Sequence, residues 1–279
     1  MNREIRTVAL FGDEDTGKSS FTRHGLRPGF SEMYGIPVGK ADVGKPAVSY
    51  VLFESPKKGD DEGHVVKEGE DYRFVPAQMK DLTSVIVRNR GYGGVTIVDC
   101  GKELYNEFMS EMAGRAGSEK RLDLVVNMVR ADASGMKPER VMANIKQVIA
   151  AGVPPERLAV VFNKSPAGVT VDELLAGPWA ELKAHAEHLG YRIIGTALGQ
   201  SFAVSGLRNM HNLTVETLAQ GQTDYEAQAE ELFVKGQTEL AEAVLGMVDL
   251  QEGARSVAQS FRAVFAELVG LEVVTPVEA

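Results

Sequence analysis

Short apolar runs alternate with amphipathic stretches along most of the chain. The apolar runs predict buried strands, and the stretches between them repeat apolar residues at helical spacing. Continuous apolar strands covered by helices are typical of a mainly parallel sheet, so we expect an α/β fold with helices on both faces. The expected strands are Thr7–Phe11, Ser49–Phe53, Val95–Val98, Leu122–Val129, Leu158–Phe162 and a less apolar sixth, Arg192–Thr196. The expected helices are Ser19–Leu26, Met79–Arg90, Leu104–Ala113, Pro138–Ala150 and Val171–Leu189.

Two segments interrupt this alternation. Residues 28–46 are rich in Gly and Pro, and residues 56–71 are rich in Lys, Asp, Glu and Gly, so both predict exposed loops. Their place after the first strand and helix allows two interpretations. They are either switch or lid segments of a nucleotide-binding protein or tolerated surface insertions.

After Asn212 the strand pattern ends. Apolar residues recur at helical spacing from Tyr225 to Val248 and again, after Gly253, from Val257 to Leu268. This predicts two C-terminal helices, which could pack on their own domain or on a partner, and we favour their own domain. We therefore expect a domain of residues 1–215 and a C-terminal helical extension of residues 216–279.

Composition narrows the class of protein. The 279 residues are 44 % apolar and 25 % charged, which excludes disordered, collagen-like and rod-like chains. The net charge of −9 opposes binding to DNA through bulk charge, so direct DNA binding should be weak or absent. A lone cysteine, Cys100, excludes an intrachain disulfide and a thiolate metal cage. No segment has the pattern of a signal peptide or a membrane span, and we expect a cytoplasmic protein.

The first expected strand runs directly into Gly12–Ser19, which matches the phosphate-binding pattern G-x-x-x-x-G-K-S. The two glycines let the backbone turn its N–H groups toward phosphate oxygens, and the following helix points its positive end at them. In this pattern Lys18 reaches the β- and γ-phosphates, Ser19 binds Mg²⁺ and Ser20 supports the α-phosphate. The candidate nucleotide-binding residues here are Gly12, Asp13, Glu14, Asp15, Thr16, Gly17, Lys18, Ser19 and Ser20.

Three of these residues, Asp13, Glu14 and Asp15, are carboxylates. A carboxylate about 8 Å from a phosphate charge costs roughly 0.5–2 kcal/mol. If their side chains point outward, the backbone can still hold the phosphates. We therefore expect weaker nucleotide affinity than in an ordinary phosphate loop, without loss of binding.

Three further strand ends carry candidate site residues. Asp99 ends an apolar strand, as in the Walker B pattern, and is a second candidate Mg²⁺ ligand beside Ser19. Asn163 and Lys164 end another strand, as in base-recognition segments, although Asn163 could simply cap the strand. A guanine-binding protein carries an aspartate where this chain has Pro166, so we favour ATP over GTP. Glu54 follows a third strand and is either a catalytic residue that positions water or an exposed strand-end glutamate.

Taken in order along the chain, these motifs resemble the StbB-type plasmid-stability proteins, relatives of the ParA/MinD partition ATPases. The likeness is strongest at the phosphate loop, around Asp99 and from Val141 to Lys164. It implies an ATPase acting in plasmid stability, partition or DNA transfer, with an ATP-dependent homodimer and a basic DNA-binding adaptor as partner. ParA-type loops carry a second lysine where this chain has Asp13, which argues against activation across a dimer and against fast hydrolysis.

The sequence thus predicts a P-loop NTPase that binds ATP and Mg²⁺ and hydrolyses ATP slowly, with Lys18 and Glu54 as catalytic residues. Two alternatives stay open. A P-loop kinase of a small molecule would need lid arginines, and a non-hydrolysing adaptor would keep its nucleotide only as a structural element.

Overall fold

A computed structural model of the chain describes residues 4–13, 15–40, 44–55, 72–74, 79–101, 108, 121–132, 137–207 and 214–270. Within them, eight strands form one sheet in the order β3-β2-β4-β1-β5-β6-β7, with β8 beside β6. Every pairing is parallel, which confirms the expected α/β class. The strands are β1 Thr7–Phe11, β2 Val48–Phe53, β3 Tyr72–Phe74, β4 Val95–Cys100, β5 Leu124–Arg130, β6 Leu158–Ser165, β7 Arg192–Ile193 and β8 Leu198–Gly199.

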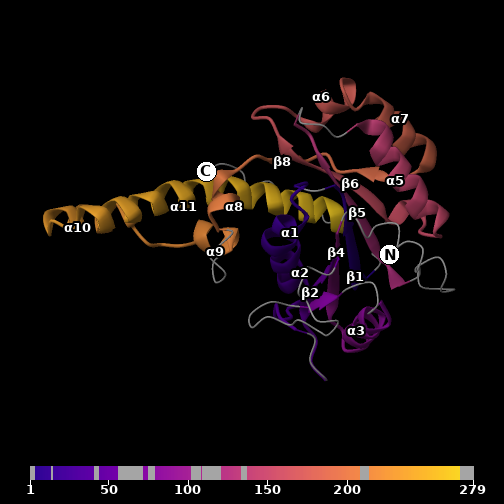
Figure 1. The fold of residues 1–279 in the computed structure, drawn as a ribbon, viewed down its shortest axis with the longest axis horizontal. Coiled ribbons are helices and arrows are strands. Elements are labelled where there is room, and N and C mark those ends of the chain that lie inside the picture. Colours follow the sequence, from indigo (N-terminus) through magenta and orange to yellow (C-terminus); the bar gives the residue numbers. More distant parts are fainter. Residues whose placement is uncertain are drawn as a thin grey trace.

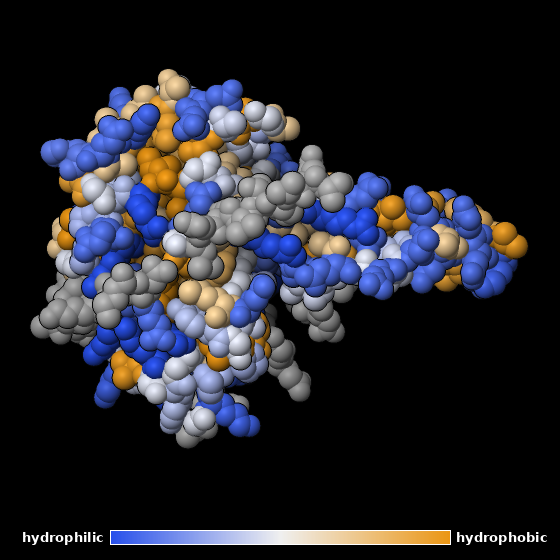
Figure 2. Space-filling view, turned by 180° about the vertical axis from the view of Figure 1, so that it is seen from behind, coloured by the Kyte–Doolittle hydropathy of each residue, from blue (hydrophilic) through white to orange (hydrophobic). Residues whose placement is uncertain are grey.

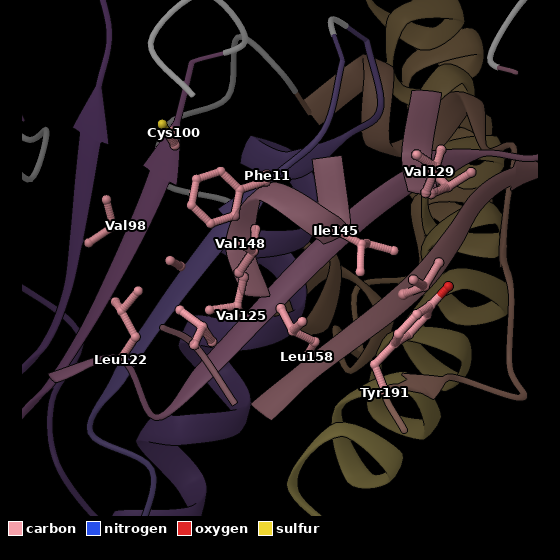
Figure 3. Close-up of a cluster of buried hydrophobic side chains, with 14 of the residues drawn as sticks. Phe11, Val98, Cys100, Leu122, Val125, Val129, Ile145, Val148, Leu158 and Tyr191 are labelled. Atoms are coloured by element: carbon pink, nitrogen blue, oxygen red, sulfur yellow. The ribbon is translucent and has the colours of Figure 1, made fainter. Parts of the chain in front are cut away.

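Helices cover both faces of the sheet (Figure 1). Helices α3, α5, α6 and α7 bury their apolar residues against one face, in the cluster around Phe11, Val125 and Ile145 that Figure 3 shows. The N-terminal helices, α8, α9 and the C-terminal half of α11 cover the other face. Their bounds are α1 Lys18–Phe21, α2 Arg27–Tyr34, α3 Met79–Gly91, α5 Pro138–Ala150, α6 Val171–Ala176, α7 Ala180–Leu189, α8 Phe202–Gly206, α9 Val215–Ala219, α10 Tyr225–Val234 and α11 Thr238–Val269, with a π-helical turn at Thr22–Leu26 and a 3₁₀ turn at Pro155–Arg157.

The expected loop at residues 28–46 is wrong in its first part, because α1, the π-helical turn and α2 run without a break from Lys18 to Tyr34. Pro28 lies in the first turn of α2, just after the wide π-helical turn, where its missing N–H is tolerated. A Cβ on Gly29 would lie 2.6 Å from the Phe265 ring, so this glycine is a helix-packing position. Gly29, one of the residues that predict a loop here, instead reflects close packing against α11.

Two other boundaries also differ from expectation. The predicted helix Val171–Leu189 is divided at Gly177 into α6 and α7. In the C-terminal region the break falls at Gly236, between α10 and α11, and not at Gly253, which lies inside α11. A Cβ on Gly253 would lie 3.0 Å from that of Ala203, so Gly253 also permits close packing. The expected loop Pro56–Asp71 and, apart from Phe108, the expected helix Leu104–Ala113 lie outside the described residues.

Helices α10 and α11 form a hairpin that projects from the body of the molecule (Figure 1). The two helices pack on each other through small residues, since Ala229 and Ala241 are both buried. The C-terminal half of α11 packs on the sheet through Phe261, Val264, Phe265 and Leu268, and Met247 and Leu250, before it, are partly buried against the same cluster. We call residues 224–252 the arm. The expectation that the C-terminal helices pack on their own domain therefore holds for one half of α11.

Candidate nucleotide site

The predicted site residues gather at the carboxyl edge of the sheet, where ligands bind in open parallel sheets. The loop after β1 carries Gly12 to Gly17, and β4 places Asp99 beside Leu10 of β1. Asn163 lies opposite Arg130, near the end of β6. Because parallel strands end on the same side, residues far apart in the sequence meet around one loop.

The loop backbone has the conformations that its glycines permit. Gly12 has φ 146° and Gly17 has φ 82°, both positive. A Cβ on Gly12 would lie 2.5 Å from the Met128 carbonyl oxygen, so both its φ and the space available require glycine there. Asp15 also has a positive φ, 55°. Glu14 lies outside the described residues.

Lys18 folds back over its own loop. Its Nζ donates hydrogen bonds to the carbonyl oxygens of Gly12 at 2.9 Å and Asp13 at 3.0 Å. Thr16 Oγ1 closes the same turn by donating to the Asp13 carbonyl at 2.9 Å. The loop thus holds its only lysine at the mouth of the turn, where a bound phosphate would take the place of the carbonyl oxygens.

Ser19 and Asp99, the two predicted Mg²⁺ ligands, are in direct contact. Ser19 Oγ donates to Asp99 Oδ2 at 2.6 Å, and the hydroxyl of Tyr50 donates to the same oxygen at 2.9 Å. Burial, together with the nearby charge of Asp99, raises the pKa of Tyr50 well above its usual value. Tyr50 therefore remains a hydrogen-bond donor that holds Asp99 in place.

The donor set at this point suits Mg²⁺, which prefers hard oxygen ligands. Mg²⁺ is usually held by one or two protein ligands together with phosphate oxygens and waters. One carboxylate and one hydroxyl meet that need. Among the described residues there is no cluster of three or more His, Cys, Asp or Glu side chains that could hold a metal without a phosphate.

Asn163 braces the loop from the neighbouring strand. Its Nδ2 donates to the Thr16 carbonyl at 2.7 Å, and a Cβ on Gly17 would lie 2.0 Å from that nitrogen. Its Oδ1 accepts from the Lys164 backbone N–H at 2.8 Å. The side-chain amide of Asn163 thus bonds to the loop and to the end of its own strand. These contacts are those of a residue that caps its strand, the simpler of the two interpretations of Asn163.

Two other candidates lie at the same edge. Glu54 follows β2 and lies beside Gly101, since a Cβ on Gly101 would lie 3.6 Å from the Cβ of Glu54. The backbone N–H of Glu54 donates to the carbonyl oxygen of Phe74 at 3.1 Å. Lys164 has a positive φ of 54° at the end of β6. Ser20 is half-buried in the first turn after the loop.

Two arginines lie close to the acidic residues of the loop. Arg140, on α5, forms an ion pair with Asp13 at 2.9 Å. Arg130, at the end of β5, has its pKa raised first by hydrogen bonds to Asp132 and in smaller part by the charge of Asp15. These contacts offset part of the repulsion that the loop carboxylates would exert on a phosphate.

Sequence reasoning missed Tyr50 and Arg140. Tyr50 lies in an apolar strand, and its sequence surroundings predict a core residue. A buried tyrosine hydroxyl needs a hydrogen-bond partner, however, and so indicates a nearby polar group. The sequence around Arg140 predicts an ordinary exposed helix residue. Its pairing with Asp13 could not be predicted, because it depends on how α5 crosses the sheet. Cys100, beside Asp99, is buried, and burial raises the pKa of its thiol, in agreement with a packing role.

The solved structures that are similar to this chain include two of McdA. One, apo McdA from Cyanothece, is 12 % identical with a TM-score of 0.46, and the match covers 92 % of this chain and 99 % of that one. The other, an ATP complex of a Cyanothece McdA variant, is 12 % identical with a TM-score of 0.45 and covers 97 % and 98 %. No protein-family model and no curated protein sequence matches.

Proposed function

We propose that the chain binds ATP with Mg²⁺ at the loop Gly12–Ser20 and hydrolyses it slowly. The observation that carries this proposal is the 2.6 Å hydrogen bond between Ser19 and Asp99, next to the loop that holds Lys18. It joins the hydroxyl of the phosphate-loop motif to the carboxylate of a neighbouring strand. A glycine turn with an incidental lysine would not need that partner.

In this proposal the loop residues act on the phosphates by charge and position. The Nζ of Lys18 exchanges the Gly12 and Asp13 carbonyls for phosphate oxygens, which are stronger acceptors because they are charged. The backbone N–H groups of the loop and the start of α1 point at the same anion. Asn163 fixes the loop from the side, so little reorganisation is needed when a phosphate arrives.

Ser19 and Asp99 would hold Mg²⁺, with Tyr50 keeping the Asp99 carboxylate in place. When bound, the metal neutralises phosphate charge as it develops. We assign Glu54 the role of positioning the attacking water, because it lies at the same sheet edge. Asp13 stands where a ParA-type protein has its second lysine and is paired with Arg140, which supports slow rather than fast hydrolysis.

The sequence resemblance to StbB-type proteins extends this proposal to a role as a switch in plasmid stability, partition or DNA transfer. A homodimer that forms with ATP and a basic DNA-binding adaptor would suit such a switch. No helix in the described part of the chain has both the length and the apolar character that a membrane crossing needs.

A turnover assay tests the proposal. Purified protein is incubated with ATP and Mg²⁺, with and without a panel of small phosphate acceptors, and ADP is measured. Slow ADP release that needs no acceptor, and that Lys18→Ala and Glu54→Gln abolish, supports a hydrolysing switch. Lys183→Ala, which removes an exposed lysine on α7, should leave the rate unchanged.

The other outcomes decide between the alternatives. ADP release that depends on an acceptor would identify a kinase. Tight ATP binding without any turnover, together with a loss of thermal stability in Lys18→Ala, would identify a non-hydrolysing adaptor.

A further inference from the structure

Asp13 binds two cations at the start of the phosphate loop. Its backbone carbonyl accepts a hydrogen bond from Nζ of Lys18 at 3.0 Å, and its carboxylate pairs with Nη2 of Arg140 at 2.9 Å. Arg140 lies in the first turn of α5, which begins at Pro138. The ion pair therefore brings the side chain of a distant helix to the same loop residue that Lys18 contacts.

The two ends of the loop would meet different phosphates. In the proposed ATP complex Ser20, in α1, supports the α-phosphate, and Lys18 reaches the β- and γ-phosphates. Nζ of Lys18 lies against the carbonyl oxygens of Gly12 and Asp13, so these two residues mark the end of the loop where the γ-phosphate would lie. Arg140 is paired at that end.

The guanidinium of Arg140 can bind a second anion while it stays paired with Asp13. The Arg140 side chain is 54 % exposed, whereas that of Asp13 is 18 % exposed. A guanidinium has five N–H donors in a planar fork, and the contact with Asp13 engages one of its terminal nitrogens. Within the described part of the chain Arg140 forms no other ion pair. Its remaining donors suit phosphate oxygens, which such a fork binds two at a time.

Arg130, the other arginine near the loop, is held differently. Its Nε donates to Oδ1 of Asp132 at 2.9 Å, and its Nη2 donates to Oδ2 of the same carboxylate at 2.6 Å. Two parallel bonds of this kind fix the plane of the guanidinium, whereas the single contact of Arg140 lets its guanidinium turn. Arg140 is therefore the arginine that is available to a phosphate.

Folding does not account for the pair of Asp13 and Arg140. An ion pair with an exposed arginine contributes little to stability, because solvent screens the charges and ordering a long side chain costs entropy. A carboxylate in a phosphate loop also repels the nucleotide. An arginine held beside the γ-phosphate would offset that repulsion and give the carboxylate a use.

We propose that Arg140 contacts the γ-phosphate of bound ATP and that Asp13 is the positioning residue that holds it there. One edge of the guanidinium stays on Asp13, and the other edge faces γ-phosphate oxygens. This inference rests on the proposed function. It gives Asp13 a role in positioning, where the sequence alone predicts only repulsion.

In the hydrolysis step Arg140 acts by its charge and transfers no proton. The oxygen of water bonds to the γ-phosphorus, and the bond to the bridging oxygen breaks, with its electron pair passing to ADP. One proton of the water stays on the phosphate, and the other is released to solvent. The guanidinium stabilises the negative charge on the transferring group, as arginines do in other phosphoryl-transfer sites.

Isothermal titration with ADP and with a non-hydrolysable ATP analogue, in the presence of Mg²⁺, tests the contact. Arg140→Gln should weaken binding of the analogue about tenfold or more and change ADP binding less than about twofold, because ADP has no γ-phosphate. Retained ADP binding also shows that the loop of the variant is folded. Lys146→Gln, which removes an exposed positive charge further along α5, should change neither affinity.

The sign of the effect of Asp13→Asn separates positioning from repulsion. If Asp13 positions Arg140, the variant should weaken binding of the analogue and lower kcat several-fold, with ADP binding unchanged. In the Arg140→Gln background the carboxylate has no arginine to position, so Asp13→Asn should strengthen binding of the analogue there, and the double-mutant cycle should show this reversal. Glu139→Gln, which removes an exposed carboxylate beside Arg140, should leave kcat unchanged.

Three results would overturn the assignment of Arg140 while leaving the proposed function intact. They are equal losses of ADP and analogue binding in Arg140→Gln, no loss of either, and tighter binding of the analogue when Asp13→Asn is made alone. In each of them the wild-type protein still binds ADP. A wild-type protein that binds neither nucleotide would instead overturn the proposed function itself, and this inference with it.

Discussion

The two halves of α11 have opposite surroundings although they belong to one continuous helix. Near its C-terminus Phe261 and Phe265 are buried against the sheet and against the N-terminal helices, with Phe265 edge-on to Phe30 at 5.0 Å. Near its N-terminus Leu240 and Leu245 are exposed and surrounded by carboxylates. The C-terminal half completes the fold, while the N-terminal half exposes apolar side chains such as Leu240 and Leu245. Figure 2 shows hydrophobic residues scattered among hydrophilic ones along this projecting part of the molecule.

This difference shows that an apolar stripe on a helix has no single meaning. Both halves repeat apolar residues at helical spacing, and the sequence pattern alone favours packing for both. What distinguishes them is the neighbouring chain, because Gly25 and Gly29 on the N-terminal helices provide room for Phe261 and Phe265, and no glycine among the described residues does so for Leu240 or Leu245. Each of the following variants compares a change in the body with a matched change in the arm or on the surface.

The largest effect should come from removing a buried ring. Phe261→Ala takes away a side chain that stacks on Phe21 at a centroid distance of 5.9 Å, and should lower the free energy of unfolding by about 3–5 kcal/mol. Phe233→Ala, in the arm, should lower it by less than about 1 kcal/mol. Urea unfolding followed by circular dichroism measures both, and equal losses would contradict the difference between the two regions.

Protonation of His24 should make the free energy of unfolding depend on pH, by about 3 kcal/mol. Burial, with a smaller contribution from Arg23, lowers its pKa from 6.5 to about 4, and its Nδ1 accepts from the Val215 N–H at 3.3 Å. Between those two pH values the unfolded chain binds a proton that the folded chain does not, so stability falls as the pH drops from 6.5 to 4. The full loss is about 3 kcal/mol.

Urea unfolding from pH 7 to pH 4 checks this, because His24→Gln should remove that part of the pH dependence. His188→Gln, at an exposed histidine, serves as the control and should leave the dependence as it is. A His24→Gln curve that is parallel to the wild-type curve would rule out His24 as the titrating group.

Two glutamates on α11 should differ by about 1–2 kcal/mol in how much their removal lowers the free energy of unfolding. In the body half, Glu267 accepts hydrogen bonds from the Gly195 N–H at 2.7 Å and from the Thr196 hydroxyl. Glu267→Ala leaves those donors without a partner and should cost about 1–3 kcal/mol. Glu242→Ala in the arm should stay within about 0.5 kcal/mol of wild type, and thermal unfolding of the two variants side by side shows whether it does.

The smallest effects come from two glycines inside helices. Gly29→Ala would place a methyl group 2.6 Å from the Phe265 ring and should destabilise the protein by about 1 kcal/mol or more, despite the higher helix propensity of alanine. A Cβ on Gly246, in the arm, would meet nothing within 4 Å, so Gly246→Ala should stabilise the protein by up to about 1 kcal/mol. Opposite signs in the two melting temperatures are the expected result, and a shift of the same sign would count against close packing at Gly29.

Much of the fold could be predicted because its strands are buried on both faces. β1 coincides with the expected Thr7–Phe11, and α5 with the expected Pro138–Ala150. The short strands β3 and β8 were missed, since two or three residues carry too little pattern. The helix through Pro28 and Gly29 was missed because those residues ordinarily mark loops. The contact with Phe265 explains Gly29, and the first turn of α2 tolerates Pro28.

The candidate site was predictable where its chemistry is local in sequence. Gly12, Gly17, Lys18 and Ser19 lie within eight residues, and their spacing alone indicates phosphate binding. The contacts that complete the site join distant elements, as Tyr50 with Asp99 and Arg140 with Asp13 do. No local pattern encodes such pairs, because they depend on the order of strands in the sheet.

Isothermal titration of the full chain with ATP and with GTP, in the presence of Mg²⁺, tests the central claim most directly. The wild-type protein should bind ATP more tightly than GTP, and Lys18→Ala should weaken ATP binding by about a hundredfold, as expected for loss of a charge-assisted contact worth roughly 3 kcal/mol. Lys183→Ala should bind as the wild type does. If the wild-type protein binds neither nucleotide at concentrations of about 1 mM, which corresponds to a binding free energy of only about −4 kcal/mol, the loop is not a nucleotide site.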